Sequence, residues 1–471
     1  MSETLDTIII GAGSAGLSAL REVRKRTDRF LIVNDGPWGT TCARVGCMPS
    51  KLLIEAASAF DRRRTFDTFG IRGADRLSVD LPAVLSRVRE LRDGFVAATI
   101  RDTEVDAARQ ISGRARLLGQ DRISVNGQEY RARHLIIATG TRPRLDPTWT
   151  AFGSRVLTTD TLFEQPTLAP RMAVLGLGPV GVEMAQALAR LGITVSAFVT
   201  RKATAGISDP EVLNALWSEL EKDFTIHIGE RAHLAAHRDG IEVISGDQRV
   251  VVDQVLAANG RVPNVEGLGL ETLGVPLDQH GLPSFDPNTR RIGDLPVFIA
   301  GDIDPDRALL HEASDEGHIA GMNTALDTPK RFRRRTPLAI SFCHPNAAVV
   351  GKSFKALENQ DFVTGAIDFS RQGRARVAQE NAGLLHVYAD RASGQLLGAE
   401  MCAPAGEHLA HLLALAIHSG MTVQQMLGMP IYHPVLEEGL RTALRRAAAQ
   451  LDVKADSDLA LCDLECSSVL E

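Results

Sequence analysis

Two cysteines, Cys42 and Cys47, lie close together in the segment GTTCARVGCMPSK at residues 39–51 of a chain with six cysteines. The first residues lack the basic and apolar regions of a signal peptide, so we expect a cytoplasmic protein. In that compartment paired cysteines are more often redox-active or metal-binding than structural. The C-x4-C spacing therefore predicts a dithiol that opens and closes, with a metal pair or chance as the alternatives.

The residues after the second cysteine predict a helix. Pro49 and the run Ser50–Ala57 favour a helix that starts just after Cys47. The partial positive charge at its amino end would stabilise a nearby thiolate, and Lys51 adds a fixed charge about one turn into the helix.

A thiol that attacks or leaves needs a base that titrates near neutrality, and imidazole is the obvious candidate. His433 precedes Pro434, and the helix expected next carries Glu437 and Glu438 in its first turn. Without the other motifs, His433 would be interpreted as a residue that precedes a helix and has no catalytic role. His311 and His344 are expected to be structural or to lie near a cofactor.

Two segments could bind nucleotides. Each has an apolar strand, a G-x-G-x-x-G turn and a helix, the pattern that holds a pyrophosphate against backbone amides. The glycines are Gly11, Gly13 and Gly16 in the first segment and Gly176, Gly178 and Gly181 in the second. One such turn is weak support, but two in the same context predict two doubly wound α/β nucleotide domains.

Length and composition agree with that architecture. At 471 residues the chain should hold about three domains. The net charge of −6 gives no general attraction for nucleic acid or anionic membranes, and no apolar run is long enough to span a bilayer. Strand-like runs lie at 134–140, 255–260 and 297–302. From about residue 336 further strand-like runs precede helices expected at 407–419 and 435–451, an order that suits an α+β domain.

Taken in order, these motifs resemble the FAD-dependent, class I pyridine nucleotide–disulfide oxidoreductases over essentially the whole chain, nearest to the dihydrolipoyl dehydrogenases. The matching residues are the two glycine turns, the C-x4-C, ATG at 138–140, Glu183, NGRVPN at 259–264, GD at 301–302 and HPVLEE at 433–438. The resemblance implies an FAD-binding domain at 1–148 and 268–335, an NAD(P)-binding domain at 149–267 and a dimerisation domain at 336–471.

The resemblance also implies roles for single residues. Cys42 would be the outer, interchange thiol and Cys47 the thiol against the flavin, with Lys51 paired to Glu183. His433, oriented by Glu438, would reach the dithiol from the other subunit of a homodimer. The residues expected to bind FAD are Gly11, Gly13, Ser14, Ala15, Gly16, Asn34, Asp35, Thr41, Lys51, Gly113, Thr139, Gly140, Asp302, Leu309 and His311. Those expected to bind NAD(P) are Gly176, Gly178, Gly181, Glu183, Val199, Arg201 and Gly260.

Several positions depart from the family pattern. Asn34 stands where an acidic residue usually binds the FAD ribose, with Asp35 next to it. The equivalent place in the second module is Val199, followed by Thr200, Arg201 and Lys202. An acid there would favour NAD, so its absence beside two basic residues tilts the expectation towards NADPH, unless those residues simply face solvent.

Other departures border the expected substrate site. GTTCARVGC replaces the usual GGTCLNVGC, Ile431 replaces a second histidine, and Val435 stands where threonine is common. The tail adds Cys462 and Cys466, which could relay electrons outwards or belong to a passive tail. Cys343 and Cys402 lie in apolar runs and are expected in the core.

The sequence therefore predicts an FAD enzyme that couples NAD(P) to a small disulfide or dithiol, or to a lipoyl-carrying protein. Dihydrolipoyl dehydrogenase is the nearest label. The alternatives are an NADPH-dependent reductase of another disulfide or of a metal ion, and a binding protein with a four-cysteine zinc site. No resident metal, nucleic acid or membrane partner is expected.

Overall fold

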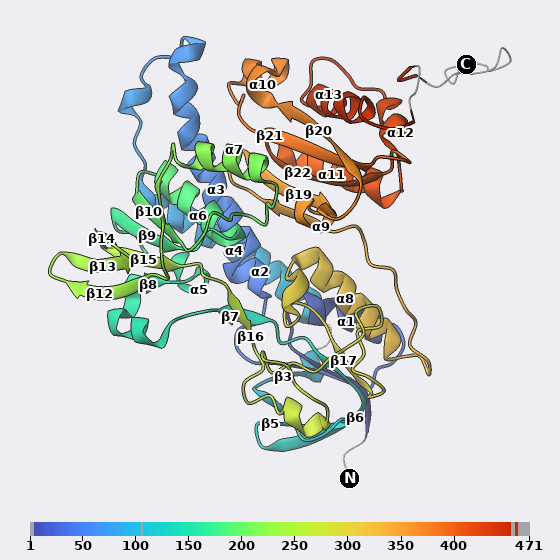
Figure 1. Cartoon of the computed structure of the whole chain (residues 1–471). Helices are drawn as coiled ribbons and strands as arrows, with labels where there is room; N and C mark the ends of the chain where they lie inside the picture. The colour runs from blue at the N-terminus through green and yellow to red at the C-terminus, as the bar shows by residue number, and fades with distance from the viewer. Residues whose placement is uncertain (1–3, 105–106, 454–456, 460–471) are drawn as a thin grey trace. The chain divides into compact units, whose positions relative to one another are not determined.

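The computed structural model describes residues 4–104, 107–453 and 457–459, and it divides into two compact units. The first unit contains residues 1–56, 79–169 and 254–334, and the second contains residues 57–78, 170–253 and 335–471. Each unit is assembled from segments far apart in the sequence (Figure 1). The three-domain division expected from the sequence stays a prediction.

The first unit is built on a parallel sheet that holds the first glycine turn. β1 (Leu5–Ile10) lies between β2 (Phe30–Asn34) and β6 (Gln128–Ile137), and β3 (Gln110–Ser112) and β17 (Val297–Ile299) extend the sheet on either side. The amino-terminal half of β6 pairs with the antiparallel strands β5 (Arg122–Val125) and β4 (Ala115–Leu117). Two short pairs complete the strands of this unit: β7 (Thr141–Pro143) with β16 (Arg261–Pro263), and β8 (Val156–Leu157) with β15 (Gln254–Ala257).

Two helices pack closely on this sheet. A Cβ added at Gly317 of α8 (Leu310–Asn323) would lie 2.0 Å from the Ala15 carbonyl oxygen of α1 (Ser14–Val23). Helices α2 (Thr41–Val45), α4 (Leu81–Glu104) and α5 (Thr159–Leu162) complete the unit, and α3 (Cys47–Asp61) runs on into the residues of the second unit.

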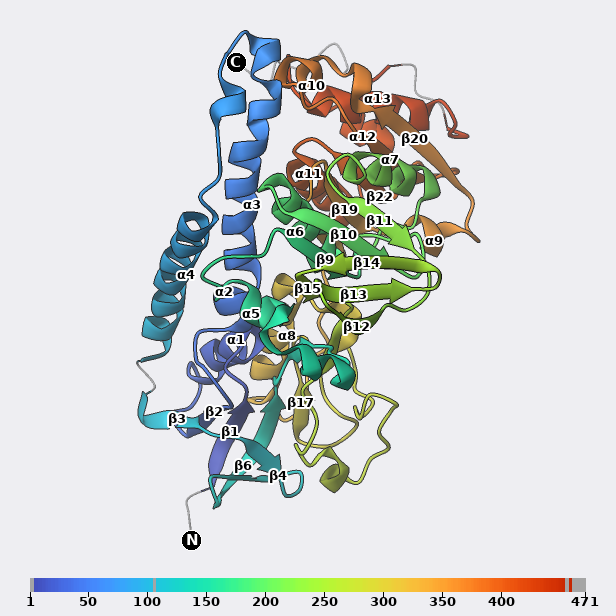
Figure 2. The same ribbon diagram turned by 90° about the vertical axis from the view of Figure 1, so that its left-hand side faces the viewer.

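The second glycine turn belongs to the second unit. Parallel strands β9 (Arg171–Leu175), β10 (Thr194–Val199) and β11 (Thr225–Ile228) are joined by α6 (Pro179–Arg190) and α7 (Pro210–Leu220). A separate antiparallel sheet follows, formed by β12 (His233–His237), β13 (Gly240–Ser245) and β14 (Gln248–Val252) (Figure 2).

The rest of the second unit is a five-stranded antiparallel sheet in the order β18-β19-β22-β21-β20. The strands are β18 (Leu338–Ser341), β19 (Asn346–Gly351), β20 (Phe362–Asp368), β21 (Leu384–Asp390) and β22 (Leu396–Ala403). Its apolar face packs against α11 (Gly406–His418), α12 (Val423–Leu427) and α13 (Glu437–Ala448), while α9 (Phe354–Leu357) and α10 (Gly373–Ala378) are short. The expected strands and the two long helices are present.

Side chains alternate along β21 with the two-residue period of a strand. Val387 belongs to the core shared with the helices, whereas His386 and Tyr388 hydrogen-bond Asp209, the residue that caps α7, at 2.7 and 2.9 Å. Beside them the fully buried Glu400 accepts bonds from the backbone N–H groups of Ser208, Asp209 and Phe354 at 2.7 to 2.8 Å. Every one of these bonds joins α9 or the segment at the start of α7 to the antiparallel sheet.

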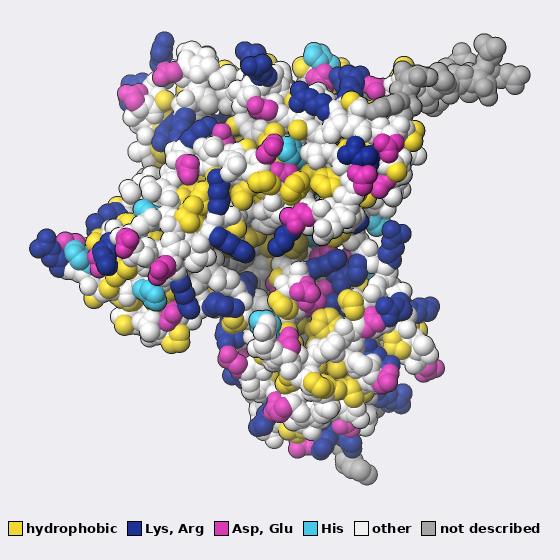
Figure 3. Space-filling model, viewed as in Figure 1, with side chains coloured by type: hydrophobic (Ala, Val, Ile, Leu, Met, Phe, Trp, Pro, Cys, Tyr) yellow, Lys and Arg dark blue, Asp and Glu magenta, His cyan; other side chains and the backbone are white. Residues whose placement is uncertain are grey.

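The distribution of charged side chains on the surface agrees with the modest net charge of the chain. Acidic and basic side chains are interspersed over the face seen in Figure 3. None of the helices in the described part of the chain is long and apolar enough to cross a membrane.

Candidate functional site

The dithiol segment folds as two consecutive helices. α2 ends at Val45 with Gly46 as its C-cap, and α3 begins at Cys47 itself, one residue earlier than the sequence suggested. Pro49 is accommodated because the first turn of a helix leaves its N–H groups without intrahelical partners. Cys47 therefore stands at the amino end of a fifteen-residue helix, where the helix dipole favours negative charge.

Cys42 and Cys47 are thiols that hydrogen-bond each other; Cys42 is partly buried and Cys47 is exposed. The hydrogen bond with the Cys47 thiol, together with burial, raises the pKa of Cys42 above that of a free thiol, and the charge of Lys51 opposes part of this rise. The raised pKa disfavours the Cys42 thiolate, and a base that removes the Cys42 proton would promote its attack on a disulfide.

The turn before Cys42 is strained. Thr40 has a φ of 58° and a ψ of 147°, although a β-branched residue rarely adopts positive φ. It stands where the usual GGTCLNVGC pattern has glycine, a residue that meets no such penalty. Its hydroxyl accepts the Ala43 N–H at 3.1 Å, which caps α2 and recovers part of the cost.

A residue outside every expected motif supports the same segment. Arg92 of α4 is nearly buried, and its guanidinium donates to the Arg44 carbonyl oxygen at 3.2 Å. It also binds both carboxylate oxygens of Glu164. The far end of α2 is thus held by an arginine that no sequence pattern singled out.

The two glycine turns share one backbone geometry. Gly11 N–H donates to the Val33 carbonyl oxygen at 2.7 Å, and Gly176 N–H donates to that of Phe198 at 2.9 Å. Asn34 and Val199 follow those acceptors, so they occupy equivalent places in the two modules, as expected. A Cβ added at Gly16 would lie 1.8 Å from the Gly11 carbonyl oxygen, whereas one at Gly13 would meet nothing within 4 Å and leaves room for a ligand.

A cavity of about 360 Å³ opens beside the first turn. Its lining includes five of the residues expected to bind FAD: Gly11, Asn34, Asp35, Gly113 and Thr139. The buried Thr139 hydroxyl oxygen has no hydrogen-bond partner among the described residues, as expected for a group that binds a polar ligand. The cavity therefore fits the nucleotide half of a dinucleotide.

Asn34 is already engaged by the chain. Its side-chain oxygen accepts the Ala12 N–H at 3.0 Å, and its amide donates to the carbonyl oxygens of Gly36 and Pro37 at 3.1 and 3.3 Å. Asp35, which is exposed and lines the same cavity, forms no ion pair with another described residue that would compete with a ligand hydroxyl.

The lining residues that were not predicted include Arg142, Asn264 and Glu266. Arg142 donates to the Asn264 side-chain oxygen at 3.2 Å and to Glu266 Oε1 at 2.7 Å, and Asn264 donates to the Thr139 carbonyl oxygen at 2.9 Å. Asn264 ends the NGRVPN motif, which was the one available signal for this group.

The remaining residues expected to bind FAD do not line this cavity. Asp302 follows β17, where burial raises the pKa of its carboxyl group and the charge of Arg261 opposes that rise. Leu309 precedes α8, and His311 is exposed on its first turn. Ser14, Ala15, Thr41, Lys51 and Gly140 also lie in the first unit, and their contacts with FAD stay predictions.

The two basic residues after β10, Arg201 and Lys202, differ in their side-chain contacts. Lys202 donates to the Asn214 side-chain oxygen at 2.6 Å and lies 5.1 Å from the Trp217 ring, whereas Arg201 is exposed and has no hydrogen-bond or ion-pair partner among the described residues. Glu183 of α6 accepts the Phe342 N–H at 2.8 Å. Glu183 and Lys51 belong to different units, so their pairing stays a prediction, as do the nucleotide contacts of Gly178, Gly181 and Gly260.

The structure brings His433 and Glu438 together, as the sequence predicted. His433 Nδ1 lies 3.1 Å from Glu438 Oε1, and this hydrogen bond lowers the pKa of Glu438. Arg441 donates to the same carboxylate at 3.2 Å. The His433 side chain is 81% exposed, so its second ring nitrogen is open to another molecule.

The other cysteines separate into two groups. Cys343 and Cys402 are fully buried, as expected, and burial raises the pKa of each to about 12. Cys462 and Cys466 lie outside the described residues. Within the described ranges, no group of three or more His, Cys, Asp or Glu residues is placed to hold a metal ion.

Comparison with known proteins adds a family to this geometry. A pyridine nucleotide-disulphide oxidoreductase model matches residues 5–317, and the dimerisation-domain model of the same family matches residues 338–444. A dihydrolipoyl dehydrogenase from Thermus scotoductus is 31% identical over 455 residues, which are 94% of this chain and 97% of that protein. One from Chlamydia pneumoniae is 28% identical over 450 residues, which are 93% and 96% of the two chains.

Solved structures share the fold. LpdA from Mycobacterium tuberculosis superposes with a TM-score of 0.82 at 24% identity, covering 93% of this chain and 99% of its own. The Cu(II) complex of the HOCl-induced flavoprotein disulfide reductase RclA from Escherichia coli has a TM-score of 0.82 at 20% identity, covering 94% and 99%.

The strain at Thr40 predicts a stabilising substitution. Thr40→Gly relieves a backbone strain of roughly 1–3 kcal/mol in the folded state. Two smaller costs oppose this gain: the lost capping hydroxyl costs a few tenths of a kcal/mol, and the greater freedom of glycine in the unfolded chain costs about 0.5–1 kcal/mol. We expect a higher urea midpoint. Thr41→Gly is the matched control, since Thr41 is helical, and it should lower the midpoint. A decrease with Thr40→Gly would show that the positive φ carries no strain.

Proposed function

The chain belongs to the pyridine nucleotide-disulphide oxidoreductase family, and from this premise we propose that it oxidises a dihydrolipoyl dithiol through Cys42 and Cys47. FAD and a nicotinamide nucleotide are the cofactors of the family, and the dimerisation domain supports a homodimer. The observation that carries the proposal is the pair of thiols formed by Cys42 of α2 and Cys47 at the amino end of α3, in the same unit as the dinucleotide cavity.

The exchange steps balance on the cysteines. With Cys42 and Cys47 joined as a disulfide, a substrate thiolate attacks Cys42 Sγ, the S–S bond breaks, and Cys47 leaves as a thiolate. The second substrate thiol then attacks the mixed disulfide, which releases Cys42 and the oxidised substrate. Two electrons and the protons displaced in the exchange have now reached the enzyme. FAD, when bound, supplies the two-electron exchange between this dithiol and NAD(P)⁺.

Charges around the dithiol suit this cycle. The amino end of α3 and the ammonium group of Lys51 favour the Cys47 thiolate. Cys42, whose pKa is raised, holds its proton unless a base removes it. Gly11, Gly13 and Gly16 would hold the FAD pyrophosphate against α1, with Asp35 and Thr139 available to its ribose.

His433 is the base that we assign to the substrate thiol. Glu438 fixes its Nδ1, stays ionised because its pKa is lowered, and would stabilise the protonated ring. We infer that His433 serves the dithiol of the partner subunit, which agrees with its high exposure in the single chain.

The substrate is supported by the relatives named dihydrolipoyl dehydrogenase. The second candidate is an NADPH-dependent reductase of another disulfide or of a metal ion. It is favoured by the exposed Arg201 after β10, which has no ion-pair partner in the described part of the chain, and by Ile431 in place of a second histidine.

A substrate panel tests the main proposal. We expect kcat/KM for dihydrolipoamide with NAD(P)⁺ to exceed those for reduction of glutathione disulfide and of Hg(II) by at least about tenfold. Cys42→Ser should abolish turnover but keep the long-wavelength absorbance of a thiolate beside the flavin, and Cys47→Ser should lose both. Higher kcat/KM with glutathione disulfide or Hg(II) would replace the lipoyl assignment, and retained absorbance in Cys47→Ser would reverse the two thiol roles.

Hybrid dimers test the shared site. Cys42→Ser and His433→Gln chains should each be nearly inactive alone. When they are co-expressed with different tags, about a quarter of wild-type activity should return, because half of randomly paired dimers are hybrids and each hybrid has one complete site. The control mixes Cys42→Ser with Cys47→Ser, which leaves every dithiol incomplete. If the first mixture is as inactive as the control, His433 does not act in the partner's site.

Arg201 provides the test of nucleotide choice. Arg201→Ala should lower kcat/KM with NADP(H) by about tenfold or more and leave NAD(H) unchanged, because only NADP(H) carries a 2′-phosphate. Lys202→Ala is the matched control, since Lys202 already bonds Asn214 and should discriminate little. An equal loss with both nucleotides would remove Arg201 from the specificity site.

A further inference from the structure

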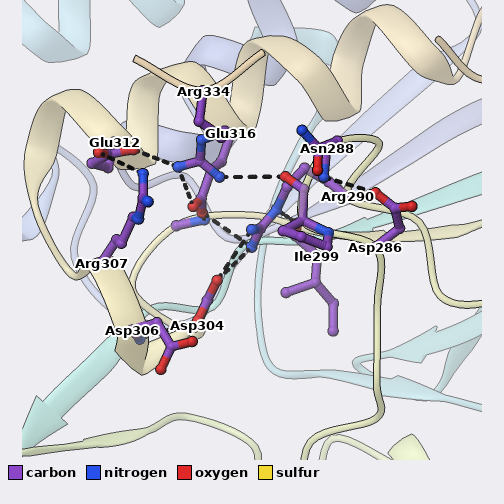
Figure 4. A network of polar contacts seen from close by, with 12 residues as sticks. Asp286, Asn288, Arg290, Ile299, Asp304, Asp306, Arg307, Glu312, Glu316 and Arg334 are labelled. Carbon is purple, nitrogen blue, oxygen red and sulfur yellow. Dashed lines mark hydrogen bonds and ion pairs between the residues drawn. The ribbon is translucent and has the colours of Figure 1, made fainter. Parts of the chain in front are cut away.

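The first unit contains a completely buried arginine. Arg290 is 0% exposed and has a φ of 64°, unusual for a residue with a side chain. It lies between Asp304 and Glu316, as Figure 4 shows. Burying a guanidinium group is costly unless every contact is satisfied, so this position needs an explanation.

The contacts of Arg290 converge on one short stretch of backbone. Its Nε donates to the Ile299 carbonyl oxygen at 2.9 Å, and the Ile299 N–H returns a bond to the Arg290 carbonyl oxygen at 2.9 Å. Its two terminal nitrogens bind Asp304 Oδ2 at 3.1 Å, and one of them lies 3.1 Å from Glu316 Oε2.

Glu316 closes the ring from the other side. The same Oε2 accepts the Gly301 N–H at 2.8 Å, and the Asp304 N–H donates to the Gly301 carbonyl oxygen at 2.9 Å. The turn from Gly301 to Asp304 is therefore held at both ends by the Arg290–Glu316 pair. Asp302, the residue of this turn expected to contact FAD, belongs to neither bond.

Charge is balanced across the network. Three arginines, Arg290, Arg307 and Arg334, face three acids, Asp304, Glu312 and Glu316. A buried network of this kind seldom stabilises a fold more than well-packed apolar side chains would, so its specific bonds to the turn are informative.

We propose that Arg290 and Glu316 are positioning residues for FAD: they fix the Gly301–Asp304 turn so that the Asp302 carboxyl group meets the cofactor. The inference rests on the proposed contact between Asp302 and FAD. In this arrangement the buried pair never touches the cofactor and acts only through the turn.

The rate of FAD release from the purified holoenzyme tests the inference, followed by the rise of flavin fluorescence after dilution. Glu316→Gln and Asp302→Asn should each accelerate release by about tenfold, the scale of one lost charge-assisted hydrogen bond. The double variant should be no more than about threefold faster than the faster single variant, because both changes remove the same contact. Arg290→Lys, which keeps the charge, should lie between Glu316→Gln and wild type.

Glu312→Gln is the matched control. Glu312 and Glu316 are equally buried, each side chain being 2% exposed, and both bind Arg334, but only Glu316 bonds the turn. Release from Glu312→Gln should be unchanged. If Glu316→Gln accelerates release no more than this control, or if the double variant multiplies the two single effects, the positioning role is wrong. If Asp302→Asn alone leaves release unchanged, the assigned FAD contact fails instead.

Discussion

The close backbone approach at the first glycine turn is the constraint on which the nucleotide-binding unit depends. Gly16 packs against the Gly11 carbonyl oxygen, and Gly11 packs against the carbonyl oxygen of Ala138 at the end of β6. A side chain at either glycine would force α1 away from the sheet. Because α8 lies on α1 through Gly317, the turn also sets the distance between the sheet and α8, which carries Glu316.

The sequence predicted those parts of the fold that follow from a residue motif or from a regular spacing of apolar residues. Both glycine turns, the long helices after residue 406 and the contact between His433 and Glu438 follow from period and motif. Helix α4 was missed because few of its residues are buried, and one of those is the charged Arg92, so its apolar stripe is narrow. The partners of Arg142 come from a distant segment, and those of Arg290 lie nearer along the chain but on β17, on α8 and in the turn between them. Spacing along the sequence cannot reveal contacts that only the fold creates.

The dithiol segment contains a strained residue, Thr40, and is stabilised by a residue from another helix, Arg92. Thr40 adopts a backbone conformation that suits glycine, and its hydroxyl group caps the helix that follows. Arg92 then holds the other end of that helix. Cys42 is thus fixed from both sides, while Cys47 begins a separate helix whose dipole favours its thiolate. The segment keeps two thiols adjacent yet gives them different electrostatic surroundings.

Glu400 limits how this protein can be recombined with its relatives. Its carboxylate, fully buried in β22, is satisfied by backbone groups of Ser208, Asp209 and Phe354. A nucleotide-binding module transplanted from another protein would have to present the N–H groups of Ser208 and Asp209, or it would leave this buried charge with the Phe354 N–H as its remaining backbone partner among those named. In a chimera the nucleotide-binding module and the antiparallel sheet should therefore be exchanged together. A chimera joined between them is expected to fold less stably.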